Sequence, residues 1–186
     1  PDPVSESLRV TLITHSYWPE QSPPQRRWTA MIKEFSHSGW DVDVVTPVAH
    51  YPFGRRALPR WMAGRPFRLR NGQFTEKILH VPYLRHGNSR AARLLDQCFS
   101  AFLSIPGGMM VRKPDVVIVT APGLPSLAAG YAVAKLRGVP LIVEMRDAWP
   151  DLARDARLVQ GSVKSVVEHV VDFVQHRADL VVTVTE

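Results

Sequence analysis

Residues 114–151, PDVVIVTAPGLPSLAAGYAVAKLRGVPLIVEMRDAWPD, decide the fold. The β-branched run over 115–120 is too short for a buried helix, so it predicts a buried parallel strand. Pro125 suits the first turn of a helix, and Gly138 stands where a left-handed residue ends one. A second strand is predicted over 140–144. A strand–helix–strand unit of this kind is right-handed and predicts a doubly wound, mostly parallel α/β sheet of the Rossmann-like type.

The N-terminal part of the chain repeats this alternation. A strand is predicted over 8–14, and a second over 41–46. Between them, Ser22 is a candidate helix N-cap with Pro23 at the first helical position, and an apolar stripe then runs to Gly39. These pieces have the size of a second strand–helix–strand unit.

The segment over 48–75 has no sustained periodicity and is rich in Arg, Pro, Gly and aromatic residues, as expected of a long functional or mobile loop. Four further elements are predicted: a strand over 77–81, a helix over 89–104 that buries Ala92, Leu95, Phe99 and Phe102, a helix from Ser162 with a valine stripe, and a buried strand over 180–185.

The order of the six predicted strands fixes where a ligand binds. The doubly wound order places the strands over 8–14 and 115–120 side by side, and ligands bind beyond the carboxyl ends of such neighbours. We therefore expect the loops over 15–25, 121–126 and 146–152 to line one crevice.

Composition narrows the class of protein. The 186 residues suffice for one domain with a real core. The single cysteine, Cys98, favours a reducing compartment, and the seven histidines show no metal-ligand spacing, so no metal is expected. The N-terminus lacks the features of a signal peptide. The uncharged run over 116–134 contains Pro122, Gly123 and Pro125, which argues against a membrane span.

Positive charge is concentrated in one region. Residues 51–93 hold ten Lys and Arg against Glu76 alone, a balance of +9 in a chain whose net charge is +6. Such a field favours an anionic partner. With interleaved aromatic residues, it predicts contact with anionic lipid through the side chains of Arg55, Arg56, Arg60 and Trp61. A solvated charged loop is the alternative.

Two loops carry candidate chemistry. The loop after the first strand, SYWPEQSPPQRR, is not a G-x-G-x-x-G or P-loop motif, which argues against a nicotinamide dehydrogenase or a P-loop enzyme. Its helix N-terminus is a candidate anion site with Arg26 and Arg27 nearby; alternatively, its prolines only stiffen a turn. After the strand over 140–144, Arg146 and Asp147 are costly to bury unpaired, so they either face ligand hydroxyls or phosphates or pair with one another.

These loops and the alternation of LRVTLITHSYWPE, GWDVDVVTP, the 114–151 stretch and RADLVVTVTE resemble the N-terminal half of a family 4 glycosyltransferase of the GT-B fold. The similarity is closest to bacterial members that build surface polysaccharides or glycolipids. It implies an acceptor-binding domain that faces a nucleotide-sugar-binding domain, with retention of anomeric configuration and no metal cofactor.

The resemblance and the predicted crevice together indicate candidate catalytic and substrate-binding residues. Asp147 is the candidate catalytic residue. The candidate substrate-binding residues are Tyr17, Trp18, Glu20, Ser22, Arg26, Pro122, Gly123, Arg146 and Trp149.

The sequence departs from the family pattern in two places. Many relatives have a Gly-Gly pair where Ser22, Pro23 and Pro24 stand here, which puts a diphosphate contact by that backbone in doubt. Relatives often have a His where Asp147 stands, and a carboxylate cannot donate a proton at neutral pH without a raised pKa.

We expect residues 1–186 to form one domain that ends where the family's interdomain linker begins, with the donor domain absent and the isolated chain inactive. The leading interpretation is half of a retaining glycosyltransferase at the inner face of the plasma membrane. Its partners are a nucleotide-sugar and a lipid-linked or polysaccharide-precursor acceptor, not nucleic acid. The alternatives are half of a nucleotide-sugar 2-epimerase and a non-catalytic module that binds nucleic acid or lipid.

Overall fold

A computed structural model describes residues 7–50, 54–56, 58–87, 89–121, 123–145 and 162–183 of the chain. They form a seven-stranded sheet in the order β3-β4-β2-β1-β5-β6-β7. Its strands are β1 (Arg9–Ile13), β2 (Asp41–Pro47), β3 (Leu69–Asn71), β4 (Lys77–Val81), β5 (Val116–Thr120), β6 (Leu141–Met145) and β7 (Leu180–Thr183). The helices are α1 (Pro23–His37), α2 (Arg60–Ala63), α3 (Arg90–Met110), α4 (Leu124–Arg137) and α6 (Ser162–Arg177).

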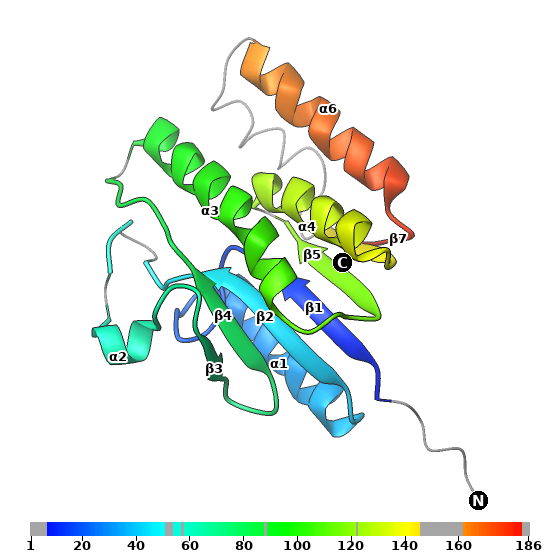
Figure 1. The fold of residues 1–186 in the computed structure, drawn as a ribbon. Helices are drawn as coiled ribbons and strands as arrows, with labels where there is room; N and C mark the ends of the chain where they lie inside the picture. Colours follow the sequence, from blue (N-terminus) through cyan, green and yellow to red (C-terminus); the bar gives the residue numbers. More distant parts are fainter. Residues whose placement is uncertain are drawn as a thin grey trace, which may run out of the picture.

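The predicted fold class and strand order are confirmed. All pairs among β4, β2, β1, β5, β6 and β7 are parallel. Helix α1 covers one face of the sheet, whereas α3, α4 and α6 cover the other (Figure 1). The chain is therefore a doubly wound, Rossmann-like α/β domain.

Each face of the sheet has its own core, because alternate residues of a strand point to opposite faces. On the α1 side, Leu12 and Val44 pack with Trp28 and Ile32. On the other side, Ile13 and Val45 belong to a larger cluster with residues of α4 and α6. Burial on both faces explains why the central strands are nearly continuous apolar runs.

Two local signals in the sequence are confirmed at the ends of helices. The Ser22 side chain accepts a hydrogen bond from the Gln25 N–H, as the N-cap of α1. Gly138 has φ 65° and ends α4 in the left-handed conformation.

The segment over 48–75 is more ordered than predicted. It contains the short helix α2 and the strand β3, which pairs antiparallel with β4 at the edge of the sheet. The Phe67 N–H donates to the His80 carbonyl at 2.7 Å, and Arg70 Nη1 donates to the Met62 carbonyl at 2.6 Å. A three-residue strand is too short to give a readable pattern, so tertiary hydrogen bonds decide it.

Helix α3 differs most from its prediction. It continues through Pro106 to Met110, and Leu95 and Phe102, expected inward, are 63% and 69% exposed. Asp96, Ser100 and Ser104 face inward instead. Near its end the helix packs closely on α4, since a Cβ at Gly108 would lie 2.7 Å from a methyl group of Val133.

At the C-terminal edge, strand β7 is exposed rather than buried, with Leu180 52% and Val181 39% exposed. Val171 and Val174 of α6 pack into the core. Among the helices of the described ranges, none has both the length and the apolar character needed to cross a membrane.

Candidate functional site

A cavity of about 350 Å³ opens beyond the carboxyl ends of β1 and β5, at the predicted switch point. Its lining comes mainly from the loop after β1, the loop after β5 and residues before and within α3. The lining residues are Thr14, His15, Ser16, Glu20, Ser22, Pro23, Pro24, His50, Gly54, His86, Arg93, Gln97, Thr120 and Gly123. Two of the three expected crevice loops therefore meet, and the third, over 146–152, lies outside the described residues.

The loop after β1 contributes a hydrogen-bonded set of polar groups. Ser16 Oγ donates to Glu20 Oε1 at 2.6 Å and lies 2.5 Å from Ser22 Oγ. Glu20 Oε2 accepts the backbone N–H of His50 at 3.2 Å. This network fixes hydroxyl and carboxylate oxygens along one wall of the cavity.

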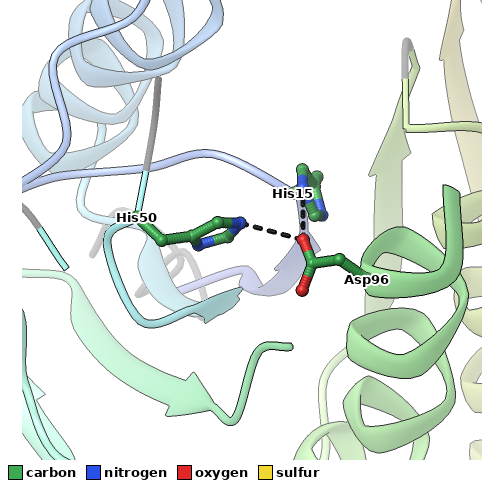
Figure 2. Close-up of side chains that lie close together, drawn as sticks. All are labelled: His15, His50 and Asp96. Atoms are coloured by element: carbon green, nitrogen blue, oxygen red, sulfur yellow. Dashed lines mark hydrogen bonds and ion pairs between the residues drawn. The ribbon is translucent and has the colours of Figure 1, made fainter. Parts of the chain in front are cut away.

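Three histidines surround one carboxylate oxygen at the base of the cavity. Asp96 Oδ2 lies 3.0 Å from the Nε2 atom of His50, 3.7 Å from that of His86 and 3.8 Å from that of His15. Figure 2 shows His15 and His50 arriving from different loops at Asp96 of α3. The other oxygen, Asp96 Oδ1, accepts the Leu84 N–H at 2.7 Å. We call His15, His50, His86 and Asp96 the histidine cluster.

Burial and hydrogen bonding set the proton positions in the histidine cluster. Burial alone would raise the pKa of Asp96, but the hydrogen bond and charge of His50 lower it overall. Burial opposes charge on His50, yet Asp96 and the Val48 carbonyl raise its pKa. Burial and the neighbouring His50 lower the pKa of His15 to about 4. At neutral pH His15 is therefore an uncharged imidazole.

Two glycines make room for these histidines. Gly54 has φ 62°, and a Cβ there would collide with the His86 ring. A Cβ at Gly123 would lie 3.0 Å from that of His15. The Gly54 carbonyl also accepts the His86 N–H at 2.9 Å. Glycine at these positions thus permits the close approach of the backbone to the cluster.

An ion pair lies at the carboxyl end of β6. Arg27 Nη2 of α1 lies 2.6 Å from Oε1 of the buried Glu144. Of the two arginines of α1 that the sequence placed near the crevice, Arg27 is thus engaged in an ion pair. Arg26, the predicted binding residue, is exposed and does not line the cavity.

The structure divides the other predicted site residues into three groups. Glu20, Ser22 and Gly123 line the cavity. Tyr17 and Trp18 belong to the α1-side core instead: the Tyr17 hydroxyl donates to Glu76 at 3.0 Å, and Arg70 stacks on Trp18 at 4.5 Å. Their aromatic rings stabilise the fold at the β3–β4 edge. Pro122, Arg146, Asp147 and Trp149 lie outside the described residues.

Of the residues predicted to face a membrane, Arg55, Arg56 and Trp61 are exposed, and Trp61 is 78% exposed. Arg60 begins α2, and its side chain lies outside the described part of the structure.

Sequence reasoning missed the histidine cluster. His15 and His50 each follow a predicted strand. Because ligands bind beyond the carboxyl ends of parallel strands, both could have been predicted as site residues. No such signal marks Asp96, which lies within a helix, or His86, which lies in an irregular connection. No short spacing relates the four residues, because the fold alone brings them together.

Comparison with known proteins gives the class. The family described as Glycosyl transferase 4-like domain matches residues 22–186, and the chain belongs to that family. Among solved structures, the chain is similar to α,α-trehalose 6-phosphate synthase from Burkholderia multivorans, at 11% identity and a TM-score of 0.42. That match covers 92% of this chain and 43% of the synthase chain. A search of curated proteins gave no match.

Proposed function

We propose that this chain is the acceptor-binding domain of a retaining, nucleotide-sugar-dependent glycosyltransferase of the GT-B type. The cavity at the β1–β5 switch point, in a chain of the glycosyl transferase 4-like family, carries the proposal. A volume of about 350 Å³ lies in the range of small-molecule sites. The proposed acceptor is a lipid-linked sugar or a polysaccharide precursor.

The lining chemistry suits a saccharide acceptor. Ser16, Glu20 and Ser22 hold oxygen atoms that accept or donate hydrogen bonds to sugar hydroxyls, and Arg93 lines the same cavity. Gln97 adds an amide with both donors and an acceptor. Fixed polar groups of this kind orient a bound sugar and give specificity.

In the proposed reaction, an acceptor hydroxyl forms a bond to the anomeric carbon of the donor sugar. The bond from that carbon to the nucleotide diphosphate breaks, the diphosphate leaves with the electron pair, and the hydroxyl proton passes to an oxygen of the departing phosphate. Cationic groups around the phosphates stabilise this departure, and we assign them to a second, donor-binding domain. Asp147 is proposed to act at the reacting centre. The transfer itself is assigned no metal.

Substitution of Asp147 tests the proposed role in the full-length protein. Asp147→Asn should lower turnover about 100-fold or more and leave the free energy of unfolding within about 1 kcal/mol. Release of nucleotide diphosphate in the presence of saccharide acceptors measures the turnover. A variant that unfolds early but keeps its turnover would place Asp147 in the fold instead. Interconversion of the nucleotide-sugar without any acceptor would identify an epimerase.

Filling the cavity tests the acceptor site separately. Gly123→Val places a branched side chain against His15, so it should raise the KM for the acceptor more than the KM for the nucleotide-sugar. Gly87→Ala is the matched control, because nothing lies within 4 Å of a Cβ at Gly87. Equal effects of Gly123→Val on both substrates would contradict the proposed acceptor site.

We also propose that the basic segment over 51–93 contacts an anionic membrane, such as the inner face of the plasma membrane. Arg55, Arg56, Arg65 and Arg68 are exposed in the same connection as Trp61. Each basic residue near an acidic surface contributes on the order of 1 kcal/mol.

Co-sedimentation with phosphatidylglycerol vesicles tests this contact. Binding should weaken with salt and in the variant Arg55→Gln/Arg56→Gln, while Lys135→Gln on α4 serves as a control. Vesicle binding that is unchanged by salt and by the Arg55→Gln/Arg56→Gln substitutions would refute the membrane contact.

A further inference from the structure

The histidine cluster has a donor arrangement that a hydrogen-bonded core does not require. The donor atoms of His15, His50 and Asp96 lie within 4.8 Å of one another. Three imidazole Nε2 atoms approach the same carboxylate oxygen at 3.0, 3.7 and 3.8 Å. One proton between His50 and Asp96 satisfies the 3.0 Å contact, but it leaves the Nε2 atoms of His15 and His86, at 3.8 and 3.7 Å from the same oxygen, directed at an atom with which they form no hydrogen bond.

The other ring nitrogens fix which lone pairs point inward. His50 Nδ1 lies 2.7 Å from the Val48 carbonyl, and His86 Nδ1 lies 2.7 Å from the Gly87 carbonyl. A carbonyl oxygen only accepts, so each Nδ1 carries the hydrogen, and in the neutral ring each Nε2 has a free lone pair toward Asp96. Metal-ligating histidines are oriented in the same way by a backbone carbonyl.

We propose that His15, His50 and Asp96 form a binding site for a divalent transition-metal ion of the Zn²⁺ type, with His86 as a positioning residue beside Asp96. Ligands at about 2.1 Å from a tetrahedral zinc ion lie about 3.4 Å apart, and the three separations from Asp96 Oδ2 bracket this value. Nitrogen-rich donors favour zinc over magnesium, which prefers oxygen.

The site is preorganised and faces the cavity. The Asp96 and His50 side chains are 0% and 5% exposed, and Asp96 Oδ1 is held by the Leu84 N–H. His15 is 21% exposed, and all three histidines line the cavity. An ion held there has one side toward a cavity ligand, whose oxygen can complete the coordination. The site lies beyond what sugar transfer in the proposed function requires.

Metal titration of the purified, tag-free protein after chelator treatment tests the proposal. Calorimetry should show one Zn²⁺ per chain with a micromolar or tighter Kd, and millimolar Mg²⁺ should not compete. Co²⁺ should give the visible absorption bands of a four- or five-coordinate site. Absence of stoichiometric Zn²⁺ binding would overturn the proposal.

Substitutions in the histidine cluster test whether the ion binds there. His50→Ala and Asp96→Asn should each weaken Zn²⁺ binding about 100-fold, and His86→Ala about 10-fold. Asp96→Asn is designed to keep the fold, because its amide oxygen still accepts the Leu84 N–H and its amide nitrogen can donate to His50 Nε2. Circular dichroism checks this. His176→Ala is the matched control, since His176 lies 3.2 Å from Asp172 in an exposed pair on α6.

Nitrogen NMR gives a second measurement that requires no sugar substrate. Zn²⁺ should shift the Nε2 resonances of His15 and His50, while the Nδ1 hydrogen of His50 stays in place. Shifts confined to His176, or binding that survives Asp96→Asn, would overturn the proposal. Because neither measurement depends on sugar transfer, failure of the metal site and failure of the glycosyltransferase function are distinguishable.

Discussion

His50 and His80 are buried histidines, at 4% and 0% exposure, beyond β2 and within β4. Each places Nδ1 near a backbone carbonyl of consecutive residues, Val48 at 2.7 Å and Pro47 at 3.3 Å. They differ at Nε2. That atom of His50 lies 3.0 Å from Asp96, whereas that of His80 is buried with no hydrogen-bond partner among the described residues.

The difference changes the charge that each ring supports. Burial lowers the pKa of His80 to about 4, and the nearby Arg70 adds to this effect. The carboxylate beside His50 more than offsets the same burial and raises its pKa. A single buried carboxylate thus separates a histidine that excludes cations from one that attracts a proton or a metal ion.

Removing that carboxylate should have the largest effect. Asp96→Leu leaves the Leu84 N–H and His50 Nε2 without their partner, so we expect a loss of about 3 to 5 kcal/mol in the free energy of unfolding. Urea unfolding at pH 7 in the presence of chelator measures it. The exposed pair of Asp172 and His176 provides the control, and Asp172→Leu should cost less than about 0.5 kcal/mol. Equal losses would mean that burial does not separate the two pairs.

Lowering the pH should destabilise the fold through the buried ring of His80. Its folded pKa of about 4 is below the unfolded value of 6.5, so the unfolded state binds the proton more readily between these pH values. Its contribution to stability is complete above pH 6.5 and should fall by about 3 kcal/mol as the pH drops to 4. His80→Gln should flatten this part of the stability curve, whereas His176→Gln should not. A curve that His80→Gln leaves unchanged would show that His80 accepts a proton in the folded state.

The glycine beside His80 should give the smallest of the three effects. Gly64 has φ 88°, and a Cβ there would collide with the His80 ring. Gly64→Ala should therefore cost about 2 kcal/mol, from backbone strain and displacement of the ring. Gly54→Ala should act in the same way on His86 and weaken Zn²⁺ binding as well. Thermal unfolding compared with Gly87→Ala measures the cost, and full stability in Gly64→Ala would contradict the tight contact.

The switch-point cavity shows which parts of a site sequence patterns can predict. Its position followed from the strand order that the doubly wound topology imposes, and Ser22 followed from capping chemistry, which depends on residues close in sequence. Tyr17 was nominated for the same loop but turns into the core, where Glu76 accepts its hydroxyl hydrogen. A loop residue beside a site can point either way, and only the packing around it decides.

By itself, the sequence determined the alternation of strands and helices, the order of the parallel strands and the ends of α1 and α4. The elements and their ends depend on apolar periodicity and on the backbone preferences of glycine and proline, which act over a few residues, and the strand order follows from the topology that repeated strand–helix–strand units adopt. Tertiary structure alone decided which face of α3 is buried. It turned Asp96 inward and left Leu95 and Phe102 outside. In this orientation α3 packs Gly107 on the sheet and Gly108 on α4, and it presents a carboxylate to the three histidines of the cluster. That convergence joins four chain segments, and no local pattern encodes the distance between them.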